Sequence, residues 1–456
     1  PWYPANRMER VFRALHEGDY DTALELLHRK SLYKKEALLL LAEVYSLYGS
    51  EALEEAYQAL EEARAEVAGL EANPLYRALL AELLALEGRP VEEVRGVFPP
   101  PPISDPRVRY HQAMALFYLG AYEEALALLP TGGLPAFLDW RAWALRGRIL
   151  ERLYRYKEAA LAHREAARRA LGLERYWSLL DAAAMHLEAG EALEALEVLE
   201  EAERSVELEG PEDGATRHYL LARAHLLLGN PQQALAFVEE ALRLEGEGGQ
   251  AAYGTPLLKA QILLALSRKA EAKEAFREAL ARAEGGERAQ VLHEMGVAAL
   301  DQGEYVEAEQ ALSELIRLES DYPHLAQAYG DLAEALYRQG RYQEAEAMAQ
   351  EAIRLGAVST GELILGHVTY DLMHLEEALE RYRKAAEAAE EGSRDWVGAM
   401  EMVVDTLAQL GYRSPEEMVE RAQKVLPYLS PSDEWYAVLQ GHLEQAQRLL
   451  SRRSLN

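Results

Sequence analysis

The stretch AQAYGDLAEALYRQGRYQEAEAMAQEAIRL, residues 326–355, contains the pattern that decides the fold. Ala345 is the reference alanine of this pattern. Two further small residues, Ala333 and Ala352, stand twelve residues before it and seven residues after it. Two helices can cross closely only where neither carries a bulky side chain. Gly340 suits the left-handed residue that ends a helix. The stretch therefore predicts two antiparallel helices joined by a tight turn.

The reference alanine recurs along most of the chain. It stands at Ala23, Ala125, Ala159, Ala195, Ala234, Ala272, Ala308, Ala345, Ala378 and Ala446. From Ala125 to Ala378 the successive spacings are 34, 36, 39, 38, 36, 37 and 33 residues. The gaps from Ala56 to Ala125 and from Ala378 to Ala446 are 69 and 68 residues, about two periods each. The chain therefore repeats one helical hairpin.

The other positions of the pattern recur in phase with this alanine. The earlier small residue is found at Ala113, Gly147, Ala183, Ala222, Ala260, Gly296, Ala333 and Gly366. The later one is found at Ala166, Ala202, Ala241, Ala279, Ala352 and Ala385. A glycine stands five residues before the reference alanine at positions 18, 120, 190, 229, 303, 340 and 441. We expect each of these glycines to end the first helix of its hairpin.

This pattern resembles the tetratricopeptide repeat family over nearly the whole chain. The matching signature residues are Tyr329, Leu332, Ala333, Gly340, Tyr342, Ala345 and Ala352. The resemblance implies an all-α fold, a right-handed superhelical solenoid of about twelve antiparallel helical hairpins. Val11, Val44 and Glu434 replace the small residue in the first two units and the last, so we expect irregular ends with C-terminal capping helices.

Four consecutive prolines interrupt the helical pattern. The run Pro99–Pro102 cannot continue a helix and favours a stiff extended spacer. It predicts an N-terminal sub-array of residues 1–98, a spacer at 99–102 and a main array of residues 103–456.

Composition excludes several classes of function. A formal charge of −29 disfavours direct binding of nucleic acid or of anionic membranes. The absence of cysteine excludes disulfides, thiolate metal sites and cysteine nucleophiles. No segment resembles a membrane span, so we expect a cytoplasmic protein, although the start at Pro1 allows for a removed signal or upstream domain. Scarce Asn and frequent Arg lean toward a thermophilic bacterium.

The first helices of the hairpins are the place where a partner would bind. In solenoids of this family these helices line the concave face. The inward-facing places fall on Tyr110, Met114, Phe117, Tyr118, Arg141, Arg148, Arg152, Trp177, Tyr219, Arg223 and His293. Arg141, Arg148 and Arg152 lie on one side of a helix, within a segment, 137–181, that has ten Lys or Arg and six Asp or Glu. They predict capture of carboxylates or an acidic peptide, unless they simply pair with glutamates such as Glu151.

No motif predicts catalysis, a metal or a cofactor. His367, Asp371 and His374 have a metal-like spacing, but the repeat register places His374 in a turn. Repeats that grip the acidic tails of chaperones need Lys and Asn where this chain has Ala144, Arg148, Leu180 and Ala184, so that partner is not expected.

The sequence thus favours a non-catalytic scaffold that binds a protein or peptide. Two alternatives stay open. One is the ligand- or peptide-sensing part of a bacterial transcription regulator whose DNA-binding domain lies outside this chain. The other is an assembly factor of the cell envelope. The sequence does not predict the oligomeric state.

Overall fold

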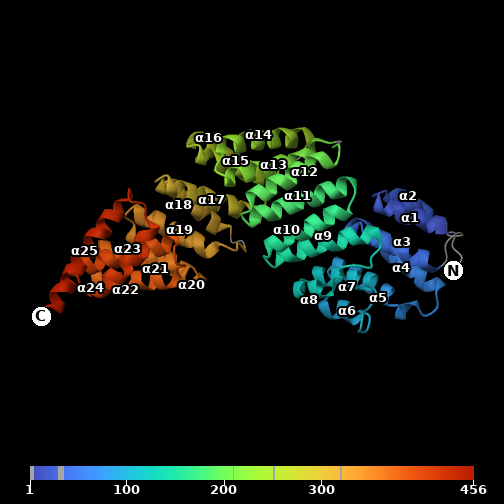
Figure 1. The fold of residues 1–456 in the computed structure, drawn as a ribbon, viewed down its shortest axis with the longest axis horizontal. Coiled ribbons are helices and arrows are strands. Elements are labelled where there is room, and N and C mark those ends of the chain that lie inside the picture. Colours follow the sequence, from blue (N-terminus) through green and yellow to red (C-terminus); the bar gives the residue numbers. More distant parts are fainter. Residues whose placement is uncertain (1–4, 29–34, 209, 250–251, 319–320) are drawn as a thin grey trace. The chain divides into compact units, whose positions relative to one another are not determined.

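The computed structural model describes residues 5–28, 35–208, 210–249, 252–318 and 321–456. In these ranges all regular structure is helical, with twenty-five α-helices and short 3-10 turns (Figure 1). The chain divides into two compact units, residues 1–251 with 261–272 and residues 252–260 with 273–456. The prediction of an all-α fold is confirmed.

The first unit contains fourteen of these helices. They are α1 (Ala5–His16), α2 (Tyr20–His28), α3 (Lys35–Ser46), α4 (Leu53–Glu66), α5 (Pro74–Glu87), α6 (Val91–Gly96), α7 (Pro106–Tyr118), α8 (Tyr122–Leu128), α9 (Ala136–Arg152), α10 (Tyr156–Arg169), α11 (Gly172–Glu188), α12 (Ala192–Ser205), α13 (Pro211–Leu227) and α14 (Pro231–Gly248). The next two helices, α15 (Gly254–Ala265) and α16 (Lys269–Arg282), contribute residues to both units.

The second unit contains the remaining helices. They are α17 (Gly286–Asp301), α18 (Tyr305–Arg317), α19 (Leu325–Arg338), α20 (Tyr342–Leu355), α21 (Val358–Asp371), α22 (Leu375–Ala388), α23 (Arg394–Gln409), α24 (Pro415–Val425) and α25 (Glu434–Ser454). Over the described ranges, α1 to α24 follow one another as twelve helical pairs and α25 stands alone at the end. The predicted number of hairpins is confirmed.

Small side chains fill the crossings between helices, as the repeat predicts. All ten reference alanines, from Ala23 to Ala446, have no exposed surface. At Gly147, Gly296 and Gly366 even a methyl group would not fit, because a Cβ would lie 2.5, 2.6 and 2.6 Å from His163, Leu312 and Tyr382, respectively. The close approach of the paired helices therefore depends on residues without bulk.

The turn glycines confirm the expected helix ends at six of seven positions. Gly18, Gly120, Gly190, Gly229, Gly303 and Gly340 all have φ between +73° and +79°, the left-handed region that glycine enters most easily. The prediction for Gly441 is wrong. It lies inside α25, a continuous helix of 21 residues, because the last repeat forms one long helix and no hairpin.

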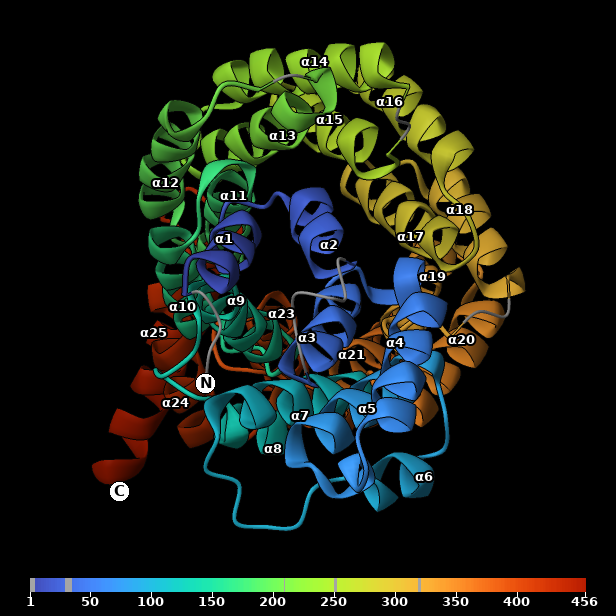
Figure 2. The same ribbon diagram turned by 90° about the vertical axis from the view of Figure 1, so that its right-hand side faces the viewer.

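The early helices of the first unit meet across more than neighbouring hairpins. α1 packs on α9, where the rings of Phe12 and Phe137 stack at 5.9 Å. α3 reaches α7 through the contact of Glu43 with His111. Figure 2 shows α1, α3 and α7 on the side that faces the viewer.

The proline run lies between α6 and α7. α5 and α7 pack directly on each other on either side of it, and Tyr76 and Tyr110 belong to one apolar core. The division into residues 1–98, 99–102 and 103–456 stays a prediction. Within the described ranges, no helix is both long enough and apolar enough to cross a membrane.

Candidate functional site

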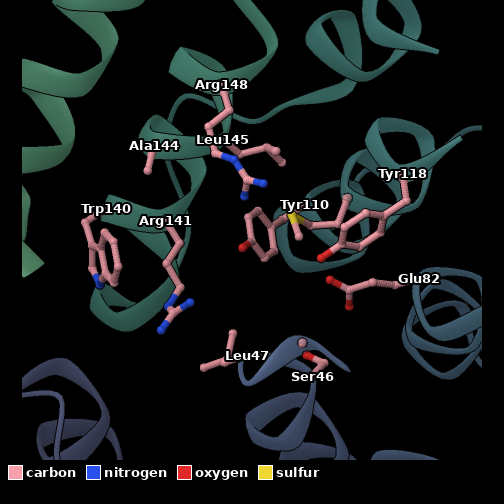
Figure 3. Close-up of a pocket in the computed structure, with 12 residues that line it drawn as sticks. Ser46, Leu47, Glu82, Tyr110, Tyr118, Trp140, Arg141, Ala144, Leu145 and Arg148 are labelled. Carbon is pink, nitrogen blue, oxygen red and sulfur yellow. The ribbon is translucent and has the colours of Figure 1, made fainter. Parts of the chain in front are cut away.

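A pocket of about 230 Å³ opens between the first helices of four hairpins in the first unit (Figure 3). α7 and α9 form two of its walls, and α5 and the end of α3 form the others. The lining residues are Ser46, Leu47, Gly49, Glu82, Tyr110, Met114, Tyr118, Trp140, Arg141, Ala144, Leu145 and Arg148. Five of the eleven inward-facing residues expected from the sequence, Tyr110, Met114, Tyr118, Arg141 and Arg148, come together here.

Aromatic rings hold the two arginines in place. The guanidinium of Arg141 lies 4.7 Å from the ring centre of Trp140, and that of Arg148 lies 4.7 Å from the ring centre of Phe117. Arg141 also donates a hydrogen bond to the hydroxyl of Tyr20, which in turn donates to Glu174 at 2.8 Å. Stacking leaves the edge of a guanidinium free to donate to another group.

Neither arginine has a carboxylate partner among the described residues. No Asp or Glu oxygen in those ranges lies within 4.0 Å of Arg141 or Arg148, so the expected pairing with Glu151 is not observed there. Two further donors at the same wall, Nε1 of Trp140 and Nε of Arg141, are buried without a hydrogen-bond partner in the described part of the chain. Buried donors of this kind are rare in native proteins.

A buried ionic network lies behind the pocket and includes one of its walls. His111 contacts Glu43 at 2.6 Å and Glu82 at 2.9 Å, and Arg107 pairs with Glu43. Burial opposes the charge on His111, but the carboxylates of Glu82 and Glu43 outweigh it and raise its pKa to about 9. Burial likewise opposes the charge on Glu43, but His111 and Arg107 hold its pKa below its usual value. These four charges balance one another.

Two tyrosines complete the polar lining. Burial raises the pKa of Tyr118 to about 12 and also raises the pKa of Tyr110, so both phenols are neutral donors at ordinary pH. In Figure 3, Tyr110 points into the space beside Arg141 and Arg148, and Tyr118 lies on the side of Glu82. The pocket thus has cationic donors at one side and a carboxylate at the other.

Burial changes the role of two expected groove residues. Tyr110 is 3% exposed and Phe117 is 8% exposed, because α5 packs against α7 and Glu43 of α3 reaches His111 of α7. Tyr110 lines the pocket, and the ring of Phe117 stacks on the guanidinium of Arg148.

The other residues expected from the sequence do not line the pocket. Arg152, in the last turn of α9, is exposed, and Trp177 on α11 is 37% exposed. Tyr219 is partly buried beside the core of α11 and α12. Arg223 on α13 pairs with Glu188 at 2.9 Å. These four residues lie on the first helices of three successive hairpins.

Sequence reasoning missed several residues of the site. Glu43 and Glu82 stand within apolar stretches of α3 and α5, and a carboxylate in such surroundings signals a buried partner. Tyr20 and Trp140 carry no comparable signal, because their roles depend on contacts between residues more than a hundred positions apart or on stacking within one turn.

In the second unit, carboxylates on the first helices have partners on neighbouring hairpins. Asp331 contacts His293 at 2.7 Å. Asp371 accepts hydrogen bonds from Tyr337 and Tyr342, both at 2.9 Å. Asp405 accepts a hydrogen bond from Tyr370 at 2.6 Å and contacts His442 at 3.3 Å. We call these contacts of Asp331, Asp371 and Asp405 the aspartate ladder.

The metal-like trio of the sequence is not assembled. His367 on α21 contacts the hydroxyl of Tyr382 at 2.8 Å, whereas His374 directly precedes α22. In the described part of the chain, no three His, Asp or Glu side chains are grouped so that they could hold a metal ion.

Comparisons with known proteins agree with the repeat. Family models described as tetratricopeptide repeat match residues 215–247, 257–285 and 287–356. A search of curated proteins finds no match. Among solved structures, PilF of Pseudomonas aeruginosa is 19% identical, over 51% of this chain and 99% of its own, with a TM-score of 0.41. The Cut9–Hcn1 hetero-tetramer of the APC/C matches at 14% identity over 91% of this chain and 97% of its own, with a TM-score of 0.40.

A tetratricopeptide repeat protein from Parabacteroides merdae matches at 16% identity over 59% of this chain and 98% of its own, with a TM-score of 0.42. Because these structures are at most 19% identical to the chain, the assignment of the repeats rests on the family models and on the buried repeat alanines. Residues 215–247, 257–285 and 287–356 therefore form tetratricopeptide repeats, and the described residues of the chain build an all-α solenoid of helical hairpins.

Proposed function

We propose that the chain is a non-catalytic scaffold that binds a protein or peptide with acidic side chains on the first helices of the first unit. One observation carries the proposal. Arg148 and Arg152 are exposed on one side of α9 and have no ion pair among the described residues, although the chain has 77 Asp and Glu. Trp177 on the next hairpin supplies an exposed ring.

Charge and shape give this surface its selectivity. A guanidinium can bind a carboxylate through two parallel hydrogen bonds, and aromatic and Arg side chains dominate the energy of many interfaces. The rest of the surface is acidic on average and repels an acidic partner, so it favours docking at α9 and α11.

The test starts from peptides selected on the immobilised full chain from a random displayed library. The affinity of the best peptide is then measured by fluorescence polarisation. We expect the selected peptides to be acidic, and the double variant Arg148→Glu, Arg152→Glu to weaken binding by at least about 10-fold. The double variant Arg155→Glu, Arg168→Glu is the matched control, because it changes the charge by the same amount at two exposed arginines that already pair with Glu158 and Glu165.

Equal weakening by the control and the double variant would mean that overall charge, and not this surface, governs binding. Selection of neutral or basic peptides would contradict the acidic partner. Neither the transcription-regulator alternative nor the cell-envelope alternative gains support from any described feature.

A further inference from the structure

We propose that the pocket of the first unit binds a small free carboxylic acid with an apolar body. This would make the unit a receptor for a small molecule, a function beyond the proposed scaffold, and Arg148 would take part in both.

The need for an anion follows from the two arginines. Arg141 and Arg148 face the pocket, are held by stacking on Trp140 and Phe117, and have no carboxylate partner in the described ranges. A chain with a formal charge of −29 has many carboxylates, yet no described one forms an ion pair with either group. Glu174 is linked to Arg141 by hydrogen bonds only through the hydroxyl of Tyr20, and Arg148 acts on Asp181 only electrostatically. Guanidinium groups held by stacking lose less conformational freedom when they bind an anion than mobile surface donors do.

A neutral donor lies on the same side of the pocket. In Figure 3 the hydroxyl of Tyr110 lies beside the two arginines and adds an O–H donor. A carboxylate has two oxygens and about four acceptor positions, which suits several N–H and O–H donors converging on one side.

The opposite wall limits the charge of the ligand. Glu82 lies there, buried against His111, and would repel a second negative charge. The balanced network of Glu43, His111, Glu82 and Arg107 adds no further positive charge. A monoanion therefore fits the pocket better than a phosphate dianion.

The remaining lining residues determine the polarity and size of the rest of the ligand. Leu47, Met114, Leu145 and the ring of Tyr118 provide apolar surface between the charged ends. The volume of about 230 Å³ lies below the roughly 300–1,000 Å³ of sites for drug-sized ligands. It suits a molecule of about ten non-hydrogen atoms, such as an aromatic or branched aliphatic acid, and is too small for several peptide residues.

The experiment is isothermal titration calorimetry on the full chain with benzoate and 3-methylbutanoate. Benzamide serves as the neutral isostere, inorganic phosphate as the multivalent anion, and an end-blocked glutamate peptide as the source of a carboxylate within a chain. We expect one of the two acids to bind once per chain with a Kd below about 1 mM, and benzamide and phosphate to bind at least about 10-fold more weakly.

Variants locate the binding. Arg141→Gln and Arg148→Gln should each weaken the acid at least about 10-fold, and Tyr110→Phe about 3-fold. Arg168→Gln on α10 is the matched control, because Arg168 is exposed, pairs with Glu165 and does not line the pocket. Circular dichroism checks that each variant is folded, and Tyr110→Phe keeps the test open should an arginine variant unfold.

Several outcomes would overturn the inference. They are no binding of either acid, equal binding of benzamide, tighter binding of phosphate, or an equal loss in the Arg168 variant. Tighter binding of the blocked peptide than of both acids would assign the pocket to a peptide side chain and overturn the free ligand. Failure of peptide selection, with the acid still bound, would instead remove only the scaffold proposal.

Discussion

The first helices of the hairpins carry polar side chains in both units, but these side chains have different partners. In the second unit, the aspartate ladder gives each of its carboxylates a partner from a neighbouring hairpin. In the first unit, Arg141 and Arg148 face a pocket and have no carboxylate partner among the described residues. Polar groups that satisfy one another join hairpins, whereas polar groups left with free donors can bind something else. The comparison separates residues that build the solenoid from residues available to a ligand.

Like the aspartate ladder, the buried network of the first unit consists of polar groups that pair with one another and join hairpins. Glu43, Glu82 and His111 come from α3, α5 and α7, so one imidazole joins three hairpins. The network differs from the ladder in burial, since His111 and Glu43 have no exposed surface, whereas His442 of the ladder is partly exposed. Loss of the buried network should therefore lower the free energy of unfolding more than loss of a contact in the aspartate ladder.

The largest effect is expected from His111→Gln. The change leaves the carboxylates of Glu43 and Glu82 buried with their shared positive partner removed, so the free energy of unfolding of the first unit should fall by about 3–5 kcal/mol. Native-state hydrogen exchange of amides in α3, α5 and α7 measures it. His442→Gln is the control, and a loss there as large as in His111→Gln would contradict the ranking by burial.

The next effect is a dependence of stability on pH in the first unit. The pKa of His111 is raised from 6.5 to about 9, so the folded state holds this proton more tightly than the unfolded state. Its contribution, on the order of 3 kcal/mol, is complete below pH 6.5 and is lost as the pH rises to about 9. Glu43, with a lowered pKa, contributes above pH 4.5 and loses its effect as the pH falls below that value.

Urea unfolding at pH values between 5 and 9.5 tests this dependence. The decline above pH 6.5 should disappear in His111→Gln. A parallel decline in the variant would assign the dependence to other groups.

The helical pattern was predictable because it rests on local sterics. Ala159, Ala345 and the other reference alanines are buried where the repeat places them. Gly441 shows the limit of the same reasoning, because a glycine after a helical turn ends a helix only if the chain then reverses, and α25 continues. A repeat signature alone does not decide between a hairpin and one long helix.

The site was predictable only in part. Helical spacing places Tyr110, Arg141 and Arg148 on the inner side, and the structure brings them to one pocket. Helical spacing does not predict the contacts around this pocket, in which α1 meets α9 and α3 meets α7 through Phe12, Phe137 and Glu43. Contacts between hairpins distant in sequence follow from the curvature of the array, which no single repeat encodes.

A smaller effect on stability is expected from a substitution at a helix crossing of the second unit. In Gly366→Ala the new Cβ would lie 2.6 Å from the ring of Tyr382, which is fully buried. Overpacking should outweigh the gain in helix propensity and lower stability by about 2 kcal/mol. Gly398→Ala is the matched control, because the nearest atom to its Cβ is 3.7 Å away, and it should stabilise by up to about 1 kcal/mol. Thermal unfolding that shifts equally in both variants would contradict the steric basis of the repeat.

The smallest effect is expected in the aspartate ladder. Tyr370→Phe removes the hydrogen bond of 2.6 Å to Asp405, but that carboxylate keeps His442 and some access to solvent. The free energy of unfolding should fall by about 1 kcal/mol, measured by hydrogen exchange of α21 and α23. Tyr428→Phe is the control, since Tyr428 is 50% exposed and donates no hydrogen bond within the described ranges. A loss above about 3 kcal/mol would place the ladder beside the buried network, and the distinction between the two units would then lie only in the unpaired arginines.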